Sequence, residues 1–283
     1  MSLFCLCAPE VLESFSRPAV VVGHPGHELK VFGWIAEHRP QVHVITDGSG
    51  RHGISRMAST ARLLGGVGAR PGEVFGSISD AEIYRALVET NIPFFLDLLE
   101  RLAGSFVQHR VDFVCGDATE GFNPTHDICR ALVNAAVMMA EQATGRGIPN
   151  YEFCLTEWEQ SRQDVHDRQC LHLRLEDDLL RRKLEAALAY GELKDEVEKA
   201  IAARGEQYFR IECLRKVPTR AMEGEPAEKP FYETFGEQRV AEGGYTSVIR
   251  YKQHMLPLLE ALGRATGPSV NNSFFSMDRA HRV

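Results

Sequence analysis

The sequence predicts an α/β protein, with a Rossmann-like, mostly parallel sheet covered by helices on both faces and a mainly helical C-terminal extension. Two observations predict this fold. In the first half, short β-branched runs alternate with segments whose apolar residues recur at helical spacing. In the second half, from about residue 175, the chain is charged and its leucines recur at helical spacing. Strands that alternate with helices form parallel sheets covered on both faces.

Each predicted element of the first half rests on a local pattern. β-branched runs at 19–22 and 42–46 predict strands, and Leu29, Phe32 and Ile35 between them recur at helical spacing. The further elements expected in this half are helices at 54–66 and 80–103, a strand at 111–115, a helix at 127–142 and a strand at 151–155.

The second half predicts an extension with a long irregular segment. The helical pattern between 175 and 214 is interrupted at Gly191 and Gly205. The stretch 218–245 has no clear period, but its aromatic residues argue against disorder, so we expect it to cover a pocket. A last helix is expected at 251–262.

The length of 283 residues suffices for one large domain, or for one domain with an appendage. The change of pattern along the chain suggests a division into two parts. We expect a Rossmann-like, metal-binding catalytic core at 1–160 and a helical, loop-rich extension packed on it at 161–283.

The composition excludes several classes of protein. Hydrophobic residues make up 44% and charged residues 25%, as in soluble globular proteins, and the net charge of −7 offers no positive surface to nucleic acid or an anionic membrane. No apolar run reaches the ~18 residues of a spanning helix, and the N-terminus lacks the basic segment of a signal peptide. Seven irregularly spaced cysteines indicate free thiols and a cytoplasmic protein. The oligomeric state, a homo-oligomer included, stays open.

Polar residues gather where three predicted strands end. The first strand runs into GHPGHE, the second into TDGSG and the third into GDATEGFNPTHD. In a doubly wound sheet, ligands bind beyond the carboxyl ends of the strands, where the strand order reverses. His24, His27 and His126 lie at these ends, and three neutral imidazoles suit Zn²⁺, or another divalent metal, with one position left open.

These motifs resemble those of the LmbE-like, or PIG-L, family of zinc-dependent N-deacetylases. That family ends its first strand with His-Pro-Asp-Asp-Glu, its second with Thr-Asp-Gly, and carries a later His-x-Asp-His; this chain has HPGHE, TDG and NPTH. The segments SRMASTARLLGGVG and FGSISD resemble further family segments, which implies that Arg56 and Asp80 bind substrate. The resemblance covers about residues 18 to 145 and implies removal of an acetyl or other acyl group from an amino sugar or related small amide.

Two departures from the family bear on the chemistry. By position, the resemblance makes His24 and His126 metal ligands and places His27 where the family has an Asp ligand. Gly26 stands in place of the general base, and Asn123 in place of a His that stabilises the oxyanion. An Asn side chain donates a hydrogen bond to an oxyanion but does not shuttle a proton.

Three carboxylates are candidates to replace the missing base. Glu28 follows the ligand turn and either accepts the proton or orients a histidine. Asp47 either acts as the base or caps the turn that ends the second strand. Glu120 lies on the loop that leads to His126, while His254 is expected to be structural. The sequence does not choose among the three.

The sequence therefore predicts a zinc-dependent hydrolase with an N-acylated sugar or similar small molecule as substrate. Two alternatives stay open. One is a catalytically altered family member that binds a metal or ligand, and the other is a related ester hydrolase. The three histidines favour an enzyme, whereas the changes at Gly26 and Asn123 favour the alternatives.

Overall fold

The computed structural model describes residues 3–5, 15–50, 53–156, 170–217, 226 and 228–267. Within these residues, eight strands form one sheet in the order β1-β7-β8-β6-β5-β2-β3-β4. The strands are β1 (Leu3–Cys5), β2 (Pro18–Val22), β3 (Gln41–Thr46), β4 (Arg70–Ile78), β5 (Phe113–Asp117), β6 (Asn150–Phe153), β7 (Cys170–Leu175) and β8 (Ile211–Lys216).

The pairing of the strands confirms a mostly parallel sheet. β2 pairs in parallel with β3 and β5, and the pairs β3–β4 and β5–β6 are parallel as well. β8, β7 and β1 extend the sheet beyond β6 through antiparallel pairs. The chain continues from β2 toward β3 on one side and reaches β5 on the other, so the strand order reverses between β2 and β5. This is where such sheets bind ligands.

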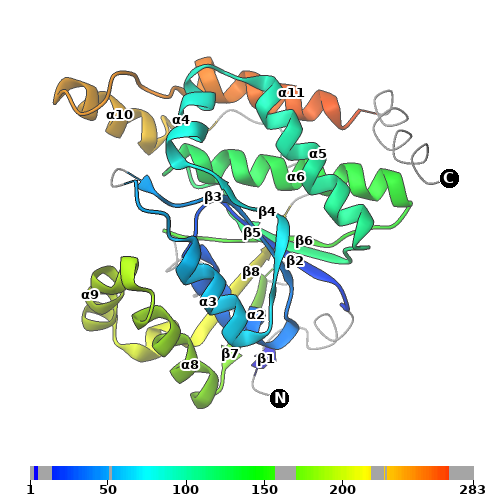
Figure 1. The fold of residues 1–283 in the computed structure, drawn as a ribbon, viewed down its shortest axis with the longest axis vertical. Coiled ribbons are helices and arrows are strands. Elements are labelled where there is room, and N and C mark those ends of the chain that lie inside the picture. The colour runs from blue at the N-terminus through cyan, green and yellow to red at the C-terminus, as the bar shows by residue number, and fades with distance from the viewer. Residues whose placement is uncertain are drawn as a thin grey trace.

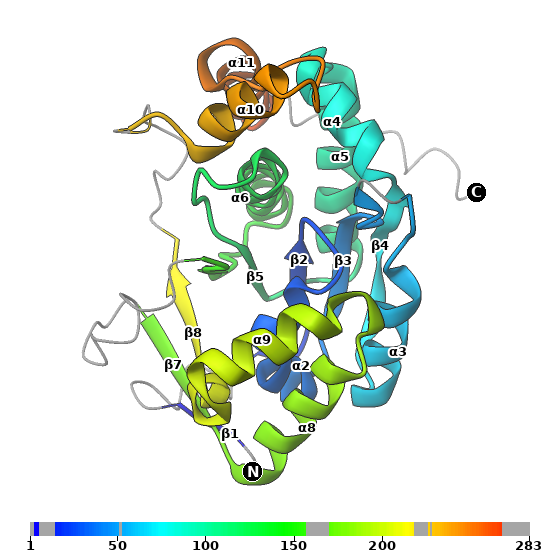
Figure 2. The same ribbon diagram turned by 90° about the vertical axis from the view of Figure 1, so that its left-hand side faces the viewer.

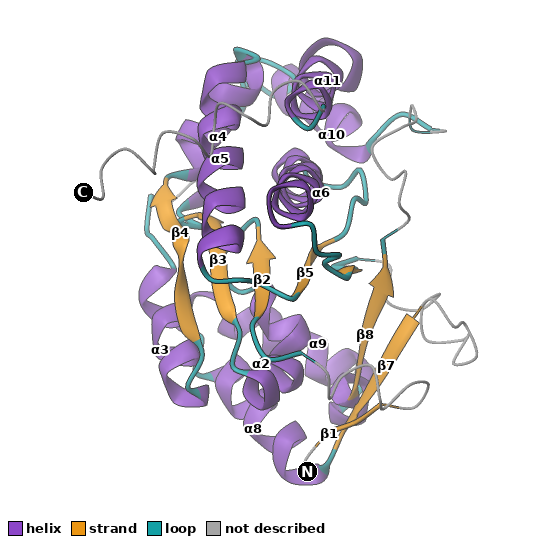
Figure 3. Ribbon diagram, turned by 90° about the vertical axis from the view of Figure 1, so that its right-hand side faces the viewer, coloured by secondary structure: helices purple, strands orange, loops and turns teal. Residues whose placement is uncertain are grey.

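Helices cover both faces of the sheet, as predicted (Figures 1 and 3). Ala19 and Val21 of β2 pack with α4, α5, α6 and α11, whereas Val20 and Val22 pack with α2, α3 and α8, because successive strand residues point to opposite faces. Figure 2 shows α8 and α9 on one side of the sheet and α10 and α11 on the other. The helices are α2 (Phe32–His38), α3 (Met57–Val67), α4 (Asp80–Val88), α5 (Ile92–Gln108), α6 (Pro124–Thr144), α8 (Asp177–Leu188), α9 (Lys194–Arg204), α10 (Phe231–Ala241) and α11 (Leu256–Ala265).

The single helix predicted at 80–103 is wrong, because the chain forms α4 and α5 with a break between them. Thr90 has a positive φ of 50°, and Asn91 caps α5 by accepting a hydrogen bond from the Phe94 N–H at 3.3 Å. Pro93 in the first turn of α5 starts a helix well but disfavours helical backbone before it. The break places Asp80 in the first turn of a short helix of its own.

The second half contains more sheet than the sequence predicts. β7 and β8 were not expected, and the helix α10 lies in the stretch 218–245 that shows no clear period. The expected domain boundary near residue 160 and the first part of that stretch lie outside the described residues. The described second half therefore extends the sheet and packs helices on both of its faces.

Two further expectations concern the thiols and the membrane. The five cysteines among the described side chains are free thiols, namely Cys115, Cys129, Cys154, Cys170 and Cys213. No described helix is both long and apolar enough to cross a membrane.

Candidate active site

The turn after β2 is held by a buried carboxylate. Gly26 has a φ of 104°, a conformation that side-chain-bearing residues rarely adopt, and it ends the turn before the short 3₁₀ helix His27–Val31. Glu28 accepts hydrogen bonds from the Gly26 N–H at 2.7 Å and from the Thr60 hydroxyl at 2.6 Å. Complete burial raises the pKa of Glu28. Both of its oxygens are thus used inside the protein, where they fix the turn.

His24 is fixed by groups from the next two strand ends. Its Nδ1 lies 2.7 Å from the hydroxyl oxygen of Thr46, the last residue of β3, and 3.1 Å from Oδ1 of Asp80, the first residue of α4. The Thr46 hydroxyl donates to the Gly23 carbonyl at 3.0 Å, so its oxygen accepts from His24. Burial alone would raise the pKa of Asp80, but hydrogen bonding to His24 and the charge of that ring lower it overall.

His27 is fixed by a carboxylate that sequence reasoning missed. Asp117, the last residue of β5, is fully buried and accepts hydrogen bonds through Oδ2 from His27 Nδ1 at 2.8 Å and from the Gly23 N–H at 2.7 Å. Burial acts to raise the pKa of Asp117, but the neighbouring His27 lowers it overall. Its position at the end of an apolar run, beside the strand that carries the histidines, was the signal available in the sequence.

His126 comes from the first turn of α6. Asn123 caps this helix, and its Oδ1 accepts hydrogen bonds from the Thr125 N–H at 2.8 Å and from the Tyr84 hydroxyl at 3.4 Å. Burial and the nearby His27 ring lower the pKa of His126 to about 3. The ring is therefore neutral near pH 7, which is the form that binds a metal ion.

The three predicted ligands lie together beside the point where the strand order reverses. Their ring centroids are 5.4 Å apart for His24 and His27, 5.2 Å for His24 and His126, and 4.6 Å for His27 and His126, with each pair edge to face. Within the described residues, no group of three or more His, Cys, Asp and Glu side chains is arranged to hold a metal ion as it stands. Binding one therefore requires some adjustment of these rings.

Unpaired buried atoms at this cluster fit a metal ion after such an adjustment. His24 Nε2, His126 Nδ1 and Asp117 Oδ1 are buried, and none has a hydrogen-bond partner among the described residues. Leaving buried polar atoms unpaired is costly, so each marks a place where a further group is expected. Nδ1 of His24 is hydrogen-bonded to a hydroxyl and Nδ1 of His27 to a carboxylate. Nε2 of each ring is therefore the atom that remains for the metal, as is usual for metal-binding histidines.

A cavity of about 1000 Å³ opens onto the three histidines. Both predicted substrate-binding residues, Arg56 and Asp80, line it. Arg85 of α4 and Glu89, the residue that follows this helix, add two more charged side chains. Its aromatic lining consists of Tyr84, Phe122, Phe231, Tyr232, Phe235 and Tyr245. The cavity therefore combines a charged region with an apolar one.

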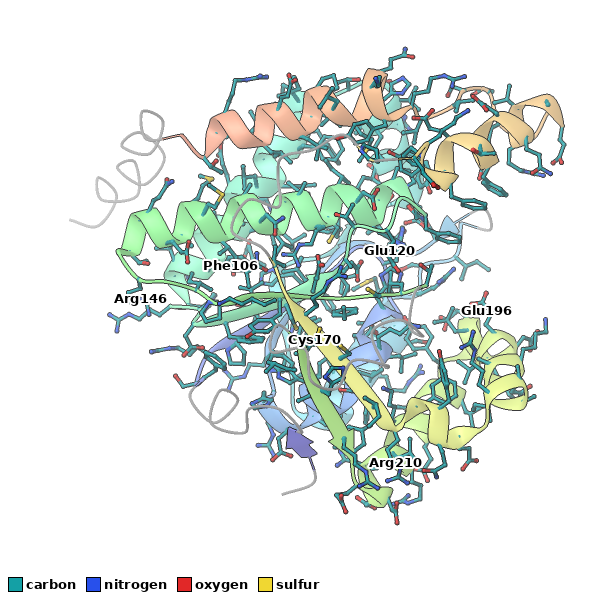
Figure 4. All side chains as sticks on the ribbon, turned by 180° about the vertical axis from the view of Figure 1, so that it is seen from behind. Phe106, Glu120, Arg146, Cys170, Glu196 and Arg210 are labelled. Carbon is teal, nitrogen blue, oxygen red and sulfur yellow. The ribbon has the colours of Figure 1, made fainter. Side chains whose placement is uncertain are left out.

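The other two base candidates make structural hydrogen bonds and do not line the cavity. Asp47 accepts from the Ser49 N–H at 2.9 Å and the Asp80 N–H at 3.3 Å, which caps the turn after β3. Glu120, labelled in Figure 4, accepts from the N–H groups of Leu155 and Thr156, both at 2.9 Å. Each carboxylate thus joins loops at the carboxyl edge of the sheet.

Comparison with known proteins places the fold. Neither a protein-family model nor a curated protein sequence matches the chain. The conserved protein TT1542 from Thermus thermophilus is similar in structure, with a TM-score of 0.51 and 16% identity over 76% of this chain and 99% of that one. A triple mutant of a deacetylase in the teicoplanin biosynthetic pathway has a TM-score of 0.46 and 12% identity, over 71% of this chain and 97% of that one. The zinc-inhibited form of the teicoplanin deacetylase Orf2 has a TM-score of 0.45 and 9% identity, over 81% and 95%. The likeness to TT1542 shows a shared fold.

Proposed function

We propose that this chain is a metal-dependent hydrolase that removes an acyl group from the nitrogen of a small amide, such as an N-acylated amino sugar. The observation that carries the proposal is the cluster of His24, His27 and His126, with two of the rings backed by Asp80 and Asp117. The motifs that resemble the N-deacetylase family provide its residues, and the cavity beside it accommodates a substrate of that size.

The three histidines would hold Zn²⁺ or a similar divalent ion. Such an ion polarises a carbonyl group and makes water a stronger nucleophile near neutral pH. Asp117 keeps the proton of His27 on Nδ1, and Thr46 and Asp80 do the same for His24, so that Nε2 of each ring is available as a ligand. The unpaired Asp117 Oδ1 also favours a positive charge close by.

Proton transfer needs a carboxylate other than one at position 26. A Cβ at Gly26 would collide with Leu193 Cδ1, so a base at this position would have to displace that leucine side chain. We assign the role of base to Asp80, because this carboxylate lines the cavity beside His24. Its oxygens also accept hydrogen bonds, Oδ1 from His24 Nδ1 and Oδ2 from the Gly50 N–H at 2.7 Å. Glu28, Asp47 and Glu120 make structural hydrogen bonds too, but they do not line the cavity.

Asn123 is suited to stabilise the oxyanion that forms as the amide is attacked. Its Oδ1 accepts from the Thr125 N–H, so its amide nitrogen is the atom that can donate toward the cavity. Arg56 lies on the same cavity and is suited to bind the hydroxyl or carbonyl oxygens of the substrate. Together they would bind and polarise the substrate without transferring a proton.

A second candidate is a metal-independent ester hydrolase. The observation that favours it is the buried hydrogen bond of 2.8 Å between Asp117 and His27 Nδ1. A carboxylate in this position fixes the tautomer of a histidine base, whose Nε2 then accepts a proton from the attacking group. Esters have a better leaving group than amides, so this reaction depends less on a leaving-group acid.

One experiment separates the two candidates. The protein is stripped with a chelator and reloaded with Zn²⁺, and hydrolysis of an N-acetylated amino sugar and of an aryl acetate ester is followed in both states. The amide hydrolase requires that amide cleavage appears only after reloading and that His126→Ala abolishes it, while the exposed His109→Ala retains it. Cleavage of the ester alone, unaffected by the chelator and lost in His27→Ala, would favour the second candidate.

A further inference from the structure

Four aromatic side chains on the cavity form a continuous group, here called the aromatic wall: Phe122, Phe231, Phe235 and Tyr245. Phe122 and Phe231 stack with centroids 5.1 Å apart and an angle of 3°, and Phe231 stacks on Phe235 at 5.7 Å. Tyr245 meets Phe235 edge to face at 6.3 Å. The rings come from three segments: the loop before α6, the helix α10 and the loop that follows it.

The rings of the aromatic wall are unusually exposed for large apolar side chains. Between 39% and 50% of each residue is open to solvent, although every one lines the cavity. Single exposed apolar residues are common on proteins, whereas several in contact on a concave surface mark a binding site. The wall is therefore apolar surface that a ligand would cover.

The aromatic wall is fixed in place before any ligand binds. The Tyr232 N–H donates to the Gly121 carbonyl at 3.3 Å, which ties α10 to the loop that carries Phe122. Glu233 accepts from the Tyr251 N–H at 2.6 Å, and Gly236 packs against Val248. A surface that is already ordered loses little conformational entropy on binding.

The aromatic wall is continuous with the histidine cluster. Phe122 directly precedes Asn123, and the same loop leads into His126. The charged side chains of the cavity, among them Arg56 and Arg85, belong to other segments of its lining. A ligand that reaches both regions needs a polar group for the first and an apolar group for the second.

We propose that the aromatic wall binds the apolar part of an amphiphilic substrate, an N-acylated amine that also carries an extended alkyl or aryl group. The identity of the reacting amide rests on the proposed function, whereas the apolar subsite rests on the rings themselves. Burying methylene groups or an aryl ring against these rings supplies affinity that a small polar amide lacks. The preferred substrate is therefore not a free N-acetylated sugar but one with an apolar substituent.

The test is a comparison of ligands on the metal-free protein, where turnover does not interfere. Calorimetry measures the affinity for methyl, butyl and octyl glycosides of N-acetylglucosamine below their micellar concentrations. We expect the octyl glycoside to bind at least about tenfold more tightly than the methyl one, with the butyl glycoside between them. The double variant Phe231→Ala/Phe235→Ala is expected to lose most of this preference.

The matched control is Val240→Ala, which removes an exposed apolar side chain of the same helix that does not line the cavity. It should keep the full preference, and thermal unfolding of all variants shows whether α10 remains folded. Equal affinity of the wild-type protein for the three glycosides would overturn the proposal without any variant. Retention of the preference in a folded double variant would overturn it as well.

Two further measurements, of hydrolysis and of vesicle binding, separate failure of the proposed hydrolysis from failure of the apolar subsite. If the octyl glycoside binds preferentially but no amide is cleaved after Zn²⁺ is added, the proposed hydrolysis fails and the apolar subsite stands. If both glycosides are cleaved with equal kcat/KM, the hydrolysis stands and the subsite fails. Sedimentation with phosphatidylcholine vesicles that depends on Phe231 and Phe235, without any preference among the glycosides, would reassign the rings to a membrane surface and overturn the proposal.

Discussion

Asp117 Oδ2 lies 2.8 Å from His27 Nδ1, and the same oxygen accepts the Gly23 N–H at 2.7 Å. One buried carboxylate at the end of β5 thus fixes both the backbone and a ring of the turn that ends β2. These two strands are neighbours, and the order of the sheet reverses between them. The position of His27 consequently depends on a residue 90 positions away in the sequence.

Replacing Asp117 by Asn tests this relationship. Asn retains the shape of the side chain but removes the charge that holds the proton on His27 Nδ1. We expect affinity for Zn²⁺ to fall about 10- to 100-fold, as is typical when the carboxylate behind a metal-binding histidine is lost. Asp97→Asn, an exposed carboxylate on α5, is the control and should leave the affinity unchanged. Similar affinities of Asp117→Asn and the wild type, measured by competition with a chelator, would show that Asp117 does not orient a ligand.

Replacing Gly26 by Asp restores the residue that the resembled family uses as base, but a side chain at this position strains the backbone and has to displace Leu193. The backbone at φ 104° and the collision with Leu193 Cδ1 both disfavour a side chain. We expect Gly26→Asp to lower the free energy of unfolding by about 1–3 kcal/mol. The same substitution is then made in a Leu193→Ala background. There, Gly26→Asp should lower the free energy of unfolding by less than it does in the wild type, as measured by urea denaturation.

The control separates backbone strain from collision. Gly53 also has a positive φ, of 66°, but a Cβ there would meet nothing within 4 Å. Gly53→Asp should therefore cost less than Gly26→Asp. If Leu193→Ala recovers none of the loss at position 26, the collision is not its cause.

Neutralising single carboxylates tests the assignment of the base. Asp80→Asn should lower kcat for amide hydrolysis by about 10²-fold when the variant is assayed saturated with Zn²⁺, because proton transfer by a positioned group contributes on that scale. Saturation is needed because Asp80 also holds His24 Nδ1, so that the variant is expected to bind Zn²⁺ more weakly. Glu120→Gln should change kcat less than about threefold, since Glu120 does not line the cavity. A larger loss of kcat in Glu120→Gln than in Asp80→Asn would move the role of base to the loop before α6.

The stability of the protein should depend on pH through His43. This ring is fully buried in β3, and burial lowers its pKa to about 3 from an ordinary value near 6.5. Between these two values the unfolded chain binds a proton that the folded protein excludes, so the free energy of unfolding decreases as pH falls. The contribution is at most ~1.4 kcal/mol per pH unit.

His43→Leu should remove this part of the dependence, as measured by urea unfolding at pH 4 to 7. The slope that remains combines His126, whose pKa is also lowered to about 3, with Asp127, whose pKa burial raises to about 7 and which acts in the opposite direction. Between pH 7 and 9 the two proteins should show the same slope, which serves as the internal control. Identical slopes between pH 4 and 7 would mean that His43 is accessible to protons in the folded state.

The sequence predicted the elements that position the histidines, because a simple rule governs them. Runs of buried residues in β2, β3 and β5 read as strands, and parallel strands bring their carboxyl ends to one edge of the sheet. The structure brings His24, His27 and His126 together at that edge. No long-range contact had to be known in advance for this part of the site.

The sequence did not predict β4, α10 and β7. The first two have irregular patterns, and the third follows a two-residue rather than a helical period. The edge strand β4 contains Pro71, Gly72 and Gly76, which weaken a strand pattern. The helix α10 buries Tyr232, Glu233 and Gly236 rather than an apolar stripe, so its helical period is obscured. In β7, Leu171, Leu173 and Leu175 alternate with other residues, and this two-residue period was available in the sequence.

The partners of the carboxylates could not be predicted because they depend on contacts between distant segments. Glu28, Asp47 and Glu120 all lie near strand ends, yet each accepts hydrogen bonds from backbone groups of the fold. Asp117 lies equally near and holds a histidine in addition to a backbone N–H. Only the arrangement in space separates carboxylates that support a turn from one that orients a ligand.

The central claim is that the three histidines bind one metal ion, and the most direct test is zinc content. Elemental analysis is performed on wild-type protein and on His24→Ala, His27→Ala, His126→Ala and His109→Ala, each dialysed against Zn²⁺ and then freed of loosely bound metal. We expect about one zinc per chain in the wild type and in His109→Ala, and a large loss in each of the other three variants. No zinc in the wild type, or an equal content in all five proteins, would contradict it.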